Sequence, residues 1–163
     1  MSEPTCRLAN LDDPADAALV LALTQGYAAD PLGQGAPLDP EVAARLIPAL
    51  RALPTTVIVL CELDGQAAAH ATCFLGFSTF AAAPLLNIHD FCVQPAWRGR
   101  GLARVLLAGV EAEARARGCV KVSLECHVGN ARALGVYWAA GFRPSGEATS
   151  LGGALFMTKP LAD

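Results

Sequence analysis

The sequence contains no long apolar run and has little net charge. No stretch of its 163 residues stays apolar for the length of a membrane span, and Met1–Pro4 lacks the basic region and apolar core of a signal peptide. With a formal net charge of −3, the chain has no general attraction for nucleic acid or an anionic membrane. We therefore expect a cytoplasmic protein with no nucleic-acid or membrane partner.

The sequence also contains no C-x-x-C pair. Its six cysteines are scattered, mostly in apolar runs typical of strands: Cys6, Cys61, Cys73, Cys92, Cys119 and Cys126. His89 with Cys92, and Cys126 with His127, are close in sequence, but each pair would point to opposite faces of a regular strand. We predict reduced, mostly buried thiols and no metal site.

Disorder is excluded by composition, because 53% of the residues are apolar. A chain of this length can enclose a core of its own. We predict one domain over residues 1–163.

A turn rich in glycine and arginine, Val93–Ala103, separates an apolar run from an amphipathic helix pattern and has the form V-x-P-x-x-R-G-x-G-L-A. Glycines let the backbone approach an anion, and the first N–H groups of the helix point to the same place. Arg104 stands where a dinucleotide-binding G-x-G-x-x-G needs its third glycine, and no Gly-Lys-Ser/Thr occurs. The run indicates a phosphate site, although this run alone leaves an ordinary solvated turn open.

A second segment has the form N-x-x-A-x-x-x-Y-x-x-x-G-F, at Asn130, Ala133, Tyr137, Gly141 and Phe142. The intervals of three and four residues place the first three on one face of a helix, and the glycine ends that helix. Together and in this order, the two segments resemble the signatures of the GCN5-related N-acetyltransferases (GNAT).

For the fold, the resemblance implies an α/β (α+β) architecture. It is a single GNAT-type domain with a mixed, mostly antiparallel central sheet, a splayed parallel strand pair and about four flanking helices. The spacing of apolar residues changes along the chain between the repeats of strands and of helices, and these changes predict the order β-α-α-β-β-β-α-β-α-β-β, which agrees with this fold. The expected strands are Thr5–Ala9, Thr56–Leu63, Gln66–Phe77, Leu85–Val93, Lys121–Cys126, Phe142–Arg143 and Ala154–Lys159, and the expected helices are Asp13–Gly26, Asp39–Pro54, Gly101–Arg117 and Asn130–Ala140.

Local signals set several of these boundaries. Asp13-Pro14 and Asp39-Pro40 each place an N-cap before a proline at the first helical position. Asp64-Gly65 predicts a hairpin turn. We expect the second helix to be interrupted near Pro48, because proline lacks the N–H donor and crowds the previous turn.

For the cofactor, the resemblance implies acetyl-CoA as cosubstrate. Main-chain groups of Phe91–Val93 would pair with the pantetheine arm, Gly99–Arg104 would hold the pyrophosphate, and Asn130 would form a hydrogen bond with the cofactor. The cofactor-binding residues implied are Phe91, Cys92, Val93, Arg98, Gly99, Arg100, Gly101, Leu102, Ala103, Arg104, Asn130, Ala133 and Tyr137.

Tyr137 matches the general acid of the family, which protonates the departing thiolate; a core tyrosine is the alternative. For the base, the Leu-Glu-x-x-x-x-Asn spacing at Glu125 is similar to that of ribosomal-protein alanine acetyltransferases. His89 and Asp90 are rivals, because Ile88–Val93 is similar to a polyamine acetyltransferase segment in which an acid stands at the histidine position. The carboxylates of Glu125 and Asp90 could instead accept hydrogen bonds from backbone N–H groups.

We therefore predict an N-acetyltransferase that moves the acetyl group of acetyl-CoA to a primary amine of a small molecule, with a homodimer as one option for its assembly. A protein N-terminal or lysine acetyltransferase and a non-catalytic acyl-CoA sensor are the alternatives, and Tyr137 argues against the sensor. Residues Leu32–Leu53 and Ser78–Leu85 are expected to line the acceptor cleft. No acidic cluster marks the acceptor as a polyamine.

Overall fold

The described residues form a seven-stranded mixed sheet with four α-helices, in the element order expected from the sequence. The computed structural model describes residues 2–145 and 153–161. Its strands are β1 (Thr5–Leu8), β2 (Thr56–Leu63), β3 (Gln66–Ser78), β4 (Ala83–Val93), β5 (Lys121–His127), β6 (Arg143–Pro144) and β7 (Ala154–Pro160). Its helices are α1 (Pro14–Ala29), α2 (Pro40–Ala52), α3 (Leu102–Ala116) and α4 (Ala131–Ala139), with a 3₁₀ turn at Pro95–Trp97.

The strand order is β1-β2-β3-β4-β5-β7-β6, and every neighbouring pair is antiparallel except β4 and β5. These two pair in parallel only from Leu86 opposite Val122 to Ile88 opposite Leu124. Beyond that point, β4 continues beside β3 and β5 continues beside β7. The splayed parallel pair expected from the sequence is confirmed, and it opens a gap within the sheet.

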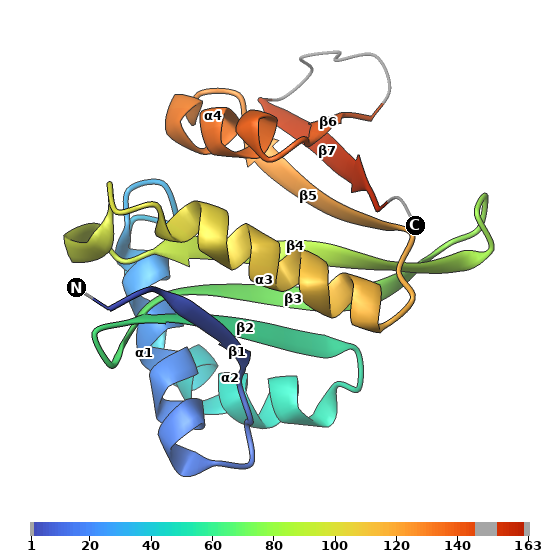
Figure 1. Ribbon diagram of the computed structural model, residues 1–163. Helices are drawn as coiled ribbons and strands as arrows, with labels where there is room; N and C mark the ends of the chain where they lie inside the picture. The colour runs from blue at the N-terminus through green and yellow to red at the C-terminus, as the bar shows by residue number, and fades with distance from the viewer. Residues whose placement is uncertain (1, 146–152, 162–163) are drawn as a thin grey trace.

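Helices cover both faces of the sheet (Figure 1). The apolar faces of α3 and α4 pack with β2–β5 into the larger core, to which Leu106, Val110 and Tyr137 belong. On the opposite face, α1 and α2 enclose a smaller core around Val20 and Leu60. Among the residues described, no helix is both long and apolar enough to cross a bilayer.

Both predicted helix starts are confirmed. The Asp13 side chain accepts a hydrogen bond from the N–H of Ala15, and the Asp39 side chain accepts one from the N–H of Glu41. Each cap satisfies a donor that the first helical turn leaves free.

The expected interruption at Pro48 was wrong, because α2 is continuous from Pro40 to Ala52. Pro48 and Ala44, whose carbonyl loses its helical partner, both lie on the exposed side of α2. Water can therefore satisfy that carbonyl, while Ile47 and Leu50 hold the helix against the smaller core.

A β-bulge in β4 sets the direction of the side chains near the gap. The register with β3 shifts between Thr72, opposite Asp90, and Cys73, opposite Ile88, so His89 is the extra residue. Ile88 before the bulge and Phe91 after it both pack into the core beneath α3. The bulge thus turns Asp90 toward the opposite face, which carries α1.

His70 on β3 is a buried histidine whose ring nitrogens have no hydrogen-bond partner among the described residues. Burial lowers its pKa from the ordinary 6.5 to about 4. Between these two pH values the histidine binds a proton in the unfolded chain but not in the native protein. The stabilisation that comes from the neutral His70 is therefore fully present above pH 6.5 and is lost as the pH falls toward 4. We predict that the free energy of unfolding falls by about 3 kcal/mol across this window.

Denaturant titrations of the wild type and His70→Leu at several pH values measure this loss. The His70→Leu protein should lack it, whereas His127→Gln, at an exposed histidine, should retain it. Asp16 and Asp30, whose pKa values Arg7 and Arg98 lower, lose their contributions at more acidic pH. Equal pH dependence in wild type and His70→Leu would contradict the prediction.

Candidate active site

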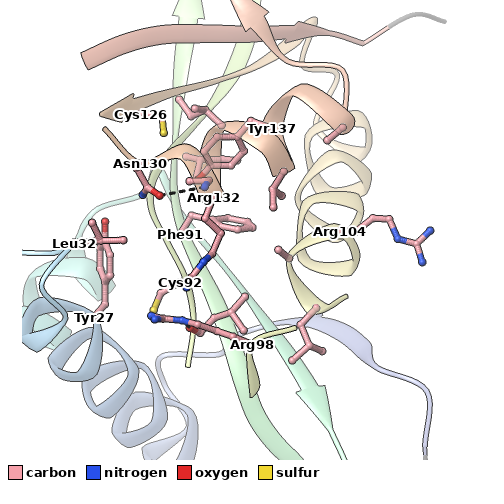
Figure 2. A pocket seen from close by; sticks show the side chains of 18 of the residues that line it. Tyr27, Leu32, Phe91, Cys92, Arg98, Arg104, Cys126, Asn130, Arg132 and Tyr137 are labelled. Atoms are coloured by element: carbon pink, nitrogen blue, oxygen red, sulfur yellow. Dashed lines mark hydrogen bonds between the residues drawn. The ribbon is translucent and has the colours of Figure 1, made fainter. Parts of the chain in front are cut away.

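A cavity of about 1080 Å³ opens where β4 and β5 separate. Its walls come from both strands, the first turn of α3, one face of α4 and the end of α1 (Figure 2). Within residues 2–145 and 153–161, the edge of β4 beyond Ile88 has no strand partner on the β5 side. An extended, peptide-like ligand can therefore pair with its main chain.

The turn before α3 forms an anion seat at one end of this cavity. Gly99 and Gly101 have φ angles of 77° and 78°, which residues other than glycine rarely adopt. Among the residues described, the N–H groups of residues 99–103 donate no hydrogen bond. These donors and the N-terminus of α3 converge, as required to hold a pyrophosphate.

The arginines near this turn have different surroundings. Arg104 lines the cavity and extends away from Tyr137 in Figure 2. Arg98 also lines it, but its guanidinium donates to an Asp30 carboxylate oxygen at 2.5 Å and to the Val93 carbonyl at 3.0 Å. Arg100 is not among the lining residues, and its guanidinium carbon lies 4.9 Å from the ring centroid of Trp97. Cofactor contacts by these side chains stay a prediction.

Tyr137 enters the cavity from α4. The Asn130 side chain caps this helix by accepting a hydrogen bond from Ala133 N–H at 3.1 Å. Edge-to-face contacts with Phe91 and Phe142, at centroid distances of 5.7 and 5.9 Å, fix the ring.

The Tyr137 hydroxyl makes no hydrogen bond with a described residue. Burial raises the pKa of this phenol above its ordinary value, so it stays protonated at neutral pH. The group can therefore donate a proton, although its pKa is less well matched to a thiolate than that of a solvated tyrosine.

The predicted base candidates lie along the gap between the two strands. Glu125 is exposed on β5 and lines the cavity, as does His89, whose ring contacts Phe74 edge-on at 5.6 Å. Asp90 is half-buried and does not line the cavity, but its charge acts on Tyr27, which does. Burial raises the pKa of Asp90, and the nearby His89 partly opposes this effect.

The cavity residues missing from the sequence prediction include Tyr27, Asp30 and Arg132. A basic residue in the first turn of a helix opposes the helix dipole, so Arg132 at the start of α4 carried a signal of a role beyond folding. Nothing local distinguished Tyr27 from a core tyrosine. Only the packing of α1 against the sheet brings it to the cavity.

In the part of the chain that the structure describes, no three His, Cys, Asp or Glu side chains are grouped to hold a metal ion. The prediction of reduced, mostly buried cysteines is confirmed, because all six are free and only Cys6 is partly exposed. Burial raises the pKa of the two thiols in the cavity, Cys92 and Cys126, and so keeps them protonated and weakly nucleophilic.

Comparison with known proteins agrees with the geometry. Residues 22–142 match the model of the acetyltransferase (GNAT) family. Over 147 residues, the chain is 31% identical to an aminoglycoside N(6')-acetyltransferase type 1 from Stenotrophomonas maltophilia, covering 86% of this chain and 87% of that protein.

Solved structures show the same fold. One is the ribosomal-protein-S18-alanine N-acetyltransferase of Escherichia coli, with 20% identity, a TM-score of 0.71 and coverage of 99% of this chain and 96% of that one. Another is the Salmonella typhimurium protein yncA with its cofactor acetyl-CoA, with 21% identity, a TM-score of 0.73 and the same coverage, 99% and 96%.

Proposed function

We propose, given that this chain belongs to the acetyltransferase (GNAT) family, that it transfers the acetyl group of acetyl-CoA to a primary amine of a small cationic molecule. Acetyl-CoA-dependent acyl transfer follows from the family, whereas the acceptor is our inference. Two carboxylates near the gap, Asp90 on β4 and Glu125 on β5, are the observation that carries it.

The chain offers a separate place for each part of acetyl-CoA. The free N–H groups of residues 99–103 would bind the pyrophosphate, with Arg104 adding positive charge. The open edge of β4 at Phe91–Val93 would pair with the pantetheine amides. The thioester would then lie between β4 and Tyr137, whose ring contacts Phe91.

The reaction requires three proton transfers: from the ammonium group to a base, from Tyr137 to the leaving thiolate, and from the acetylated nitrogen back to Tyr137. The amine, once deprotonated, attacks the thioester carbonyl carbon, and the carbon–sulfur bond breaks as the nitrogen–carbon bond forms. The leaving thiolate of CoA takes the phenolic proton of Tyr137. The acetylated nitrogen then loses its excess proton, which returns through solvent to the Tyr137 phenolate and restores the phenol. A carboxylate, Glu125 directly or Asp90 through water, accepts the proton of the arriving ammonium group; the products are an N-acetyl amine and CoA thiol.

A small cationic amine fits the part of the cavity that Glu125, Tyr27 and Leu32 line. Glu125 and Asp90 attract an ammonium group. Tyr27 and the 59% exposed Leu32 offer apolar contact to the rest of a small molecule. The curated relative, an aminoglycoside acetyltransferase by its name, makes amino sugars the first class to test. Cytoplasmic location and the homodimer stay predictions.

CoA thiol release, measured over a panel of kanamycin, spermidine, free amino acids and a peptide with N-terminal alanine, tests this proposal. We expect kanamycin or another small polyamine-like compound to have the highest kcat/KM. Preferential acetylation of the peptide would instead establish the protein-acetyltransferase alternative. Release with none of these acceptors, despite acetyl-CoA binding, would contradict the proposed acceptor class.

Asp90→Asn should raise the KM of the best cationic acceptor by about tenfold with little change in kcat, because it removes a negative charge that attracts the bound ammonium group from beside the cavity. Glu125→Gln should lower activity most at low pH, where the acceptor is fully protonated. Glu3→Gln removes an equal charge from an exposed position outside the cavity and should change neither constant. Uniform losses at all pH values in Glu125→Gln would assign Glu125 to positioning.

A further inference from the structure

Arg98 and Asp30 form an ion pair that joins the phosphate turn to the end of α1. The Nη2 atom of Arg98 lies 2.5 Å from Oδ2 of Asp30, and the two side chains are 32% and 9% exposed. The same guanidinium donates through Nε to the carbonyl of Val93, the last residue of β4. Arg98 therefore connects three segments: the turn, β4 and α1.

Asp30 also organises the chain that follows α1. Its Oδ1 accepts a hydrogen bond from the N–H of Leu32 at 2.9 Å, and its carbonyl accepts one from Gly33 at 2.8 Å. A Cβ atom at Gly33 would lie 2.1 Å from the carbonyl oxygen of Tyr27, so the turn returns closely over the helix end. This turn fixes Tyr27 and Leu32, which we name the acceptor wall.

The pairing argues against Arg98 as a phosphate ligand. Moving the guanidinium to a pyrophosphate would leave a nearly buried Asp30 carboxylate without its partner, which is strongly unfavourable. Arg98 also lowers the pKa of Asp30, so this carboxylate is ionised at neutral pH. The free N–H groups of residues 99–103 are available for the phosphates without it. Arg132, whose charge also acts on Asp30, is too exposed to replace the pair.

We propose that Asp30 and Arg98 are positioning residues for the acceptor: their ion pair holds the acceptor wall against the phosphate turn and sets acceptor affinity, not cofactor affinity. This inference rests on the proposed function in one respect, that the wall contacts the amine substrate. The ion pair holds an apolar surface, Tyr27 and Leu32, at a fixed place beside the cavity.

The test compares Asp30→Asn, Arg98→Gln and the double variant with the wild type, using kanamycin as acceptor or the best acceptor of the panel. Either single change should raise acceptor KM by about tenfold, with smaller changes in kcat and in the acetyl-CoA Kd measured by calorimetry. The double variant should be no worse than the singles, because both remove one interaction. Arg98→Lys keeps the charge and should recover part of the acceptor affinity.

Arg104→Gln is the matched control. It removes an arginine that lines the cavity from the first turn of α3, directly after the phosphate turn, and that has no ion-pair partner among the described residues. It should weaken acetyl-CoA binding and reduce its salt dependence while leaving acceptor KM nearly unchanged. If Arg98→Gln instead weakens acetyl-CoA binding as much as Arg104→Gln, or if the losses in Asp30→Asn and Arg98→Gln add, the proposal is overturned.

Hydrogen exchange at the amides of residues 32–36 gives a readout that needs no acceptor. Asp30→Asn and Arg98→Gln should both accelerate this exchange, and Arg104→Gln should not. A wild type that acetylates no amine of the panel defeats the proposed function alone. An active wild type whose KM and exchange are unaffected by either variant defeats the positioning role alone.

Discussion

Replacing Tyr137 with phenylalanine is expected to lower kcat by about one to three orders of magnitude while leaving acetyl-CoA affinity unchanged, because it removes the group that protonates the leaving thiolate. The ring contacts with Phe91 and Phe142 remain, so no cavity forms. The hydroxyl has no hydrogen-bond partner among the described residues, so its loss leaves no other group unsatisfied. Steady-state kinetics and calorimetry on the same preparation measure both quantities.

Tyr27→Phe is the control for this experiment. It removes a phenolic hydroxyl from Tyr27, which lines the cavity from α1 and belongs to the proposed acceptor wall. We expect it to change kcat by less than about threefold. If the two substitutions lower kcat equally, or if Tyr137→Phe leaves it unchanged, Tyr137 is a packing residue.

Introducing glutamate at Gly101 is expected to abolish most acetyl-CoA binding. The carboxylate would enter the anion seat, and two like charges about 5 Å apart at an effective dielectric constant of about 20 repel by about 3 kcal/mol. This energy corresponds to a loss of about 100-fold in affinity. Calorimetric titration with acetyl-CoA at low and high salt measures it, and high salt should recover part of the loss.

Gly101→Gln separates charge from backbone strain. Both side chains face the same strain at a φ of 78°, about 1–2 kcal/mol, and both enter space with no atom within 4 Å of the new Cβ. Glutamine should therefore weaken binding much less than glutamate. Equal affinities for wild type and Gly101→Glu would show that the phosphates bind elsewhere.

Local sequence determined the elements and the anion seat, because the energies involved act within a few residues. Asp13 and Asp39 cap their helices through their own side chains. Gly99 and Gly101 supply the positive φ angles that the turn before α3 requires. The spacing from Asn130 to Tyr137 places both on the cavity side of α4 for the same reason, the helical repeat.

Tertiary structure decided whatever depends on exposure or on distant partners. Pro48 failed to interrupt α2 because its side of the helix faces water, which no local pattern specifies. In a regular strand Asp90 would share a face with Ile88, and only the bulge against β3 turns it to the opposite face.

The partner of Arg98 could not be read from the sequence, since Asp30 lies 68 residues away. The phosphate turn by itself predicts an arginine free to bind an anion. Whether that charge is free depends on which carboxylate the fold brings within hydrogen-bond distance. The packing of α1 against the sheet places Asp30 there, and the attraction between the two charges depends on their distance in space, not on their separation along the chain.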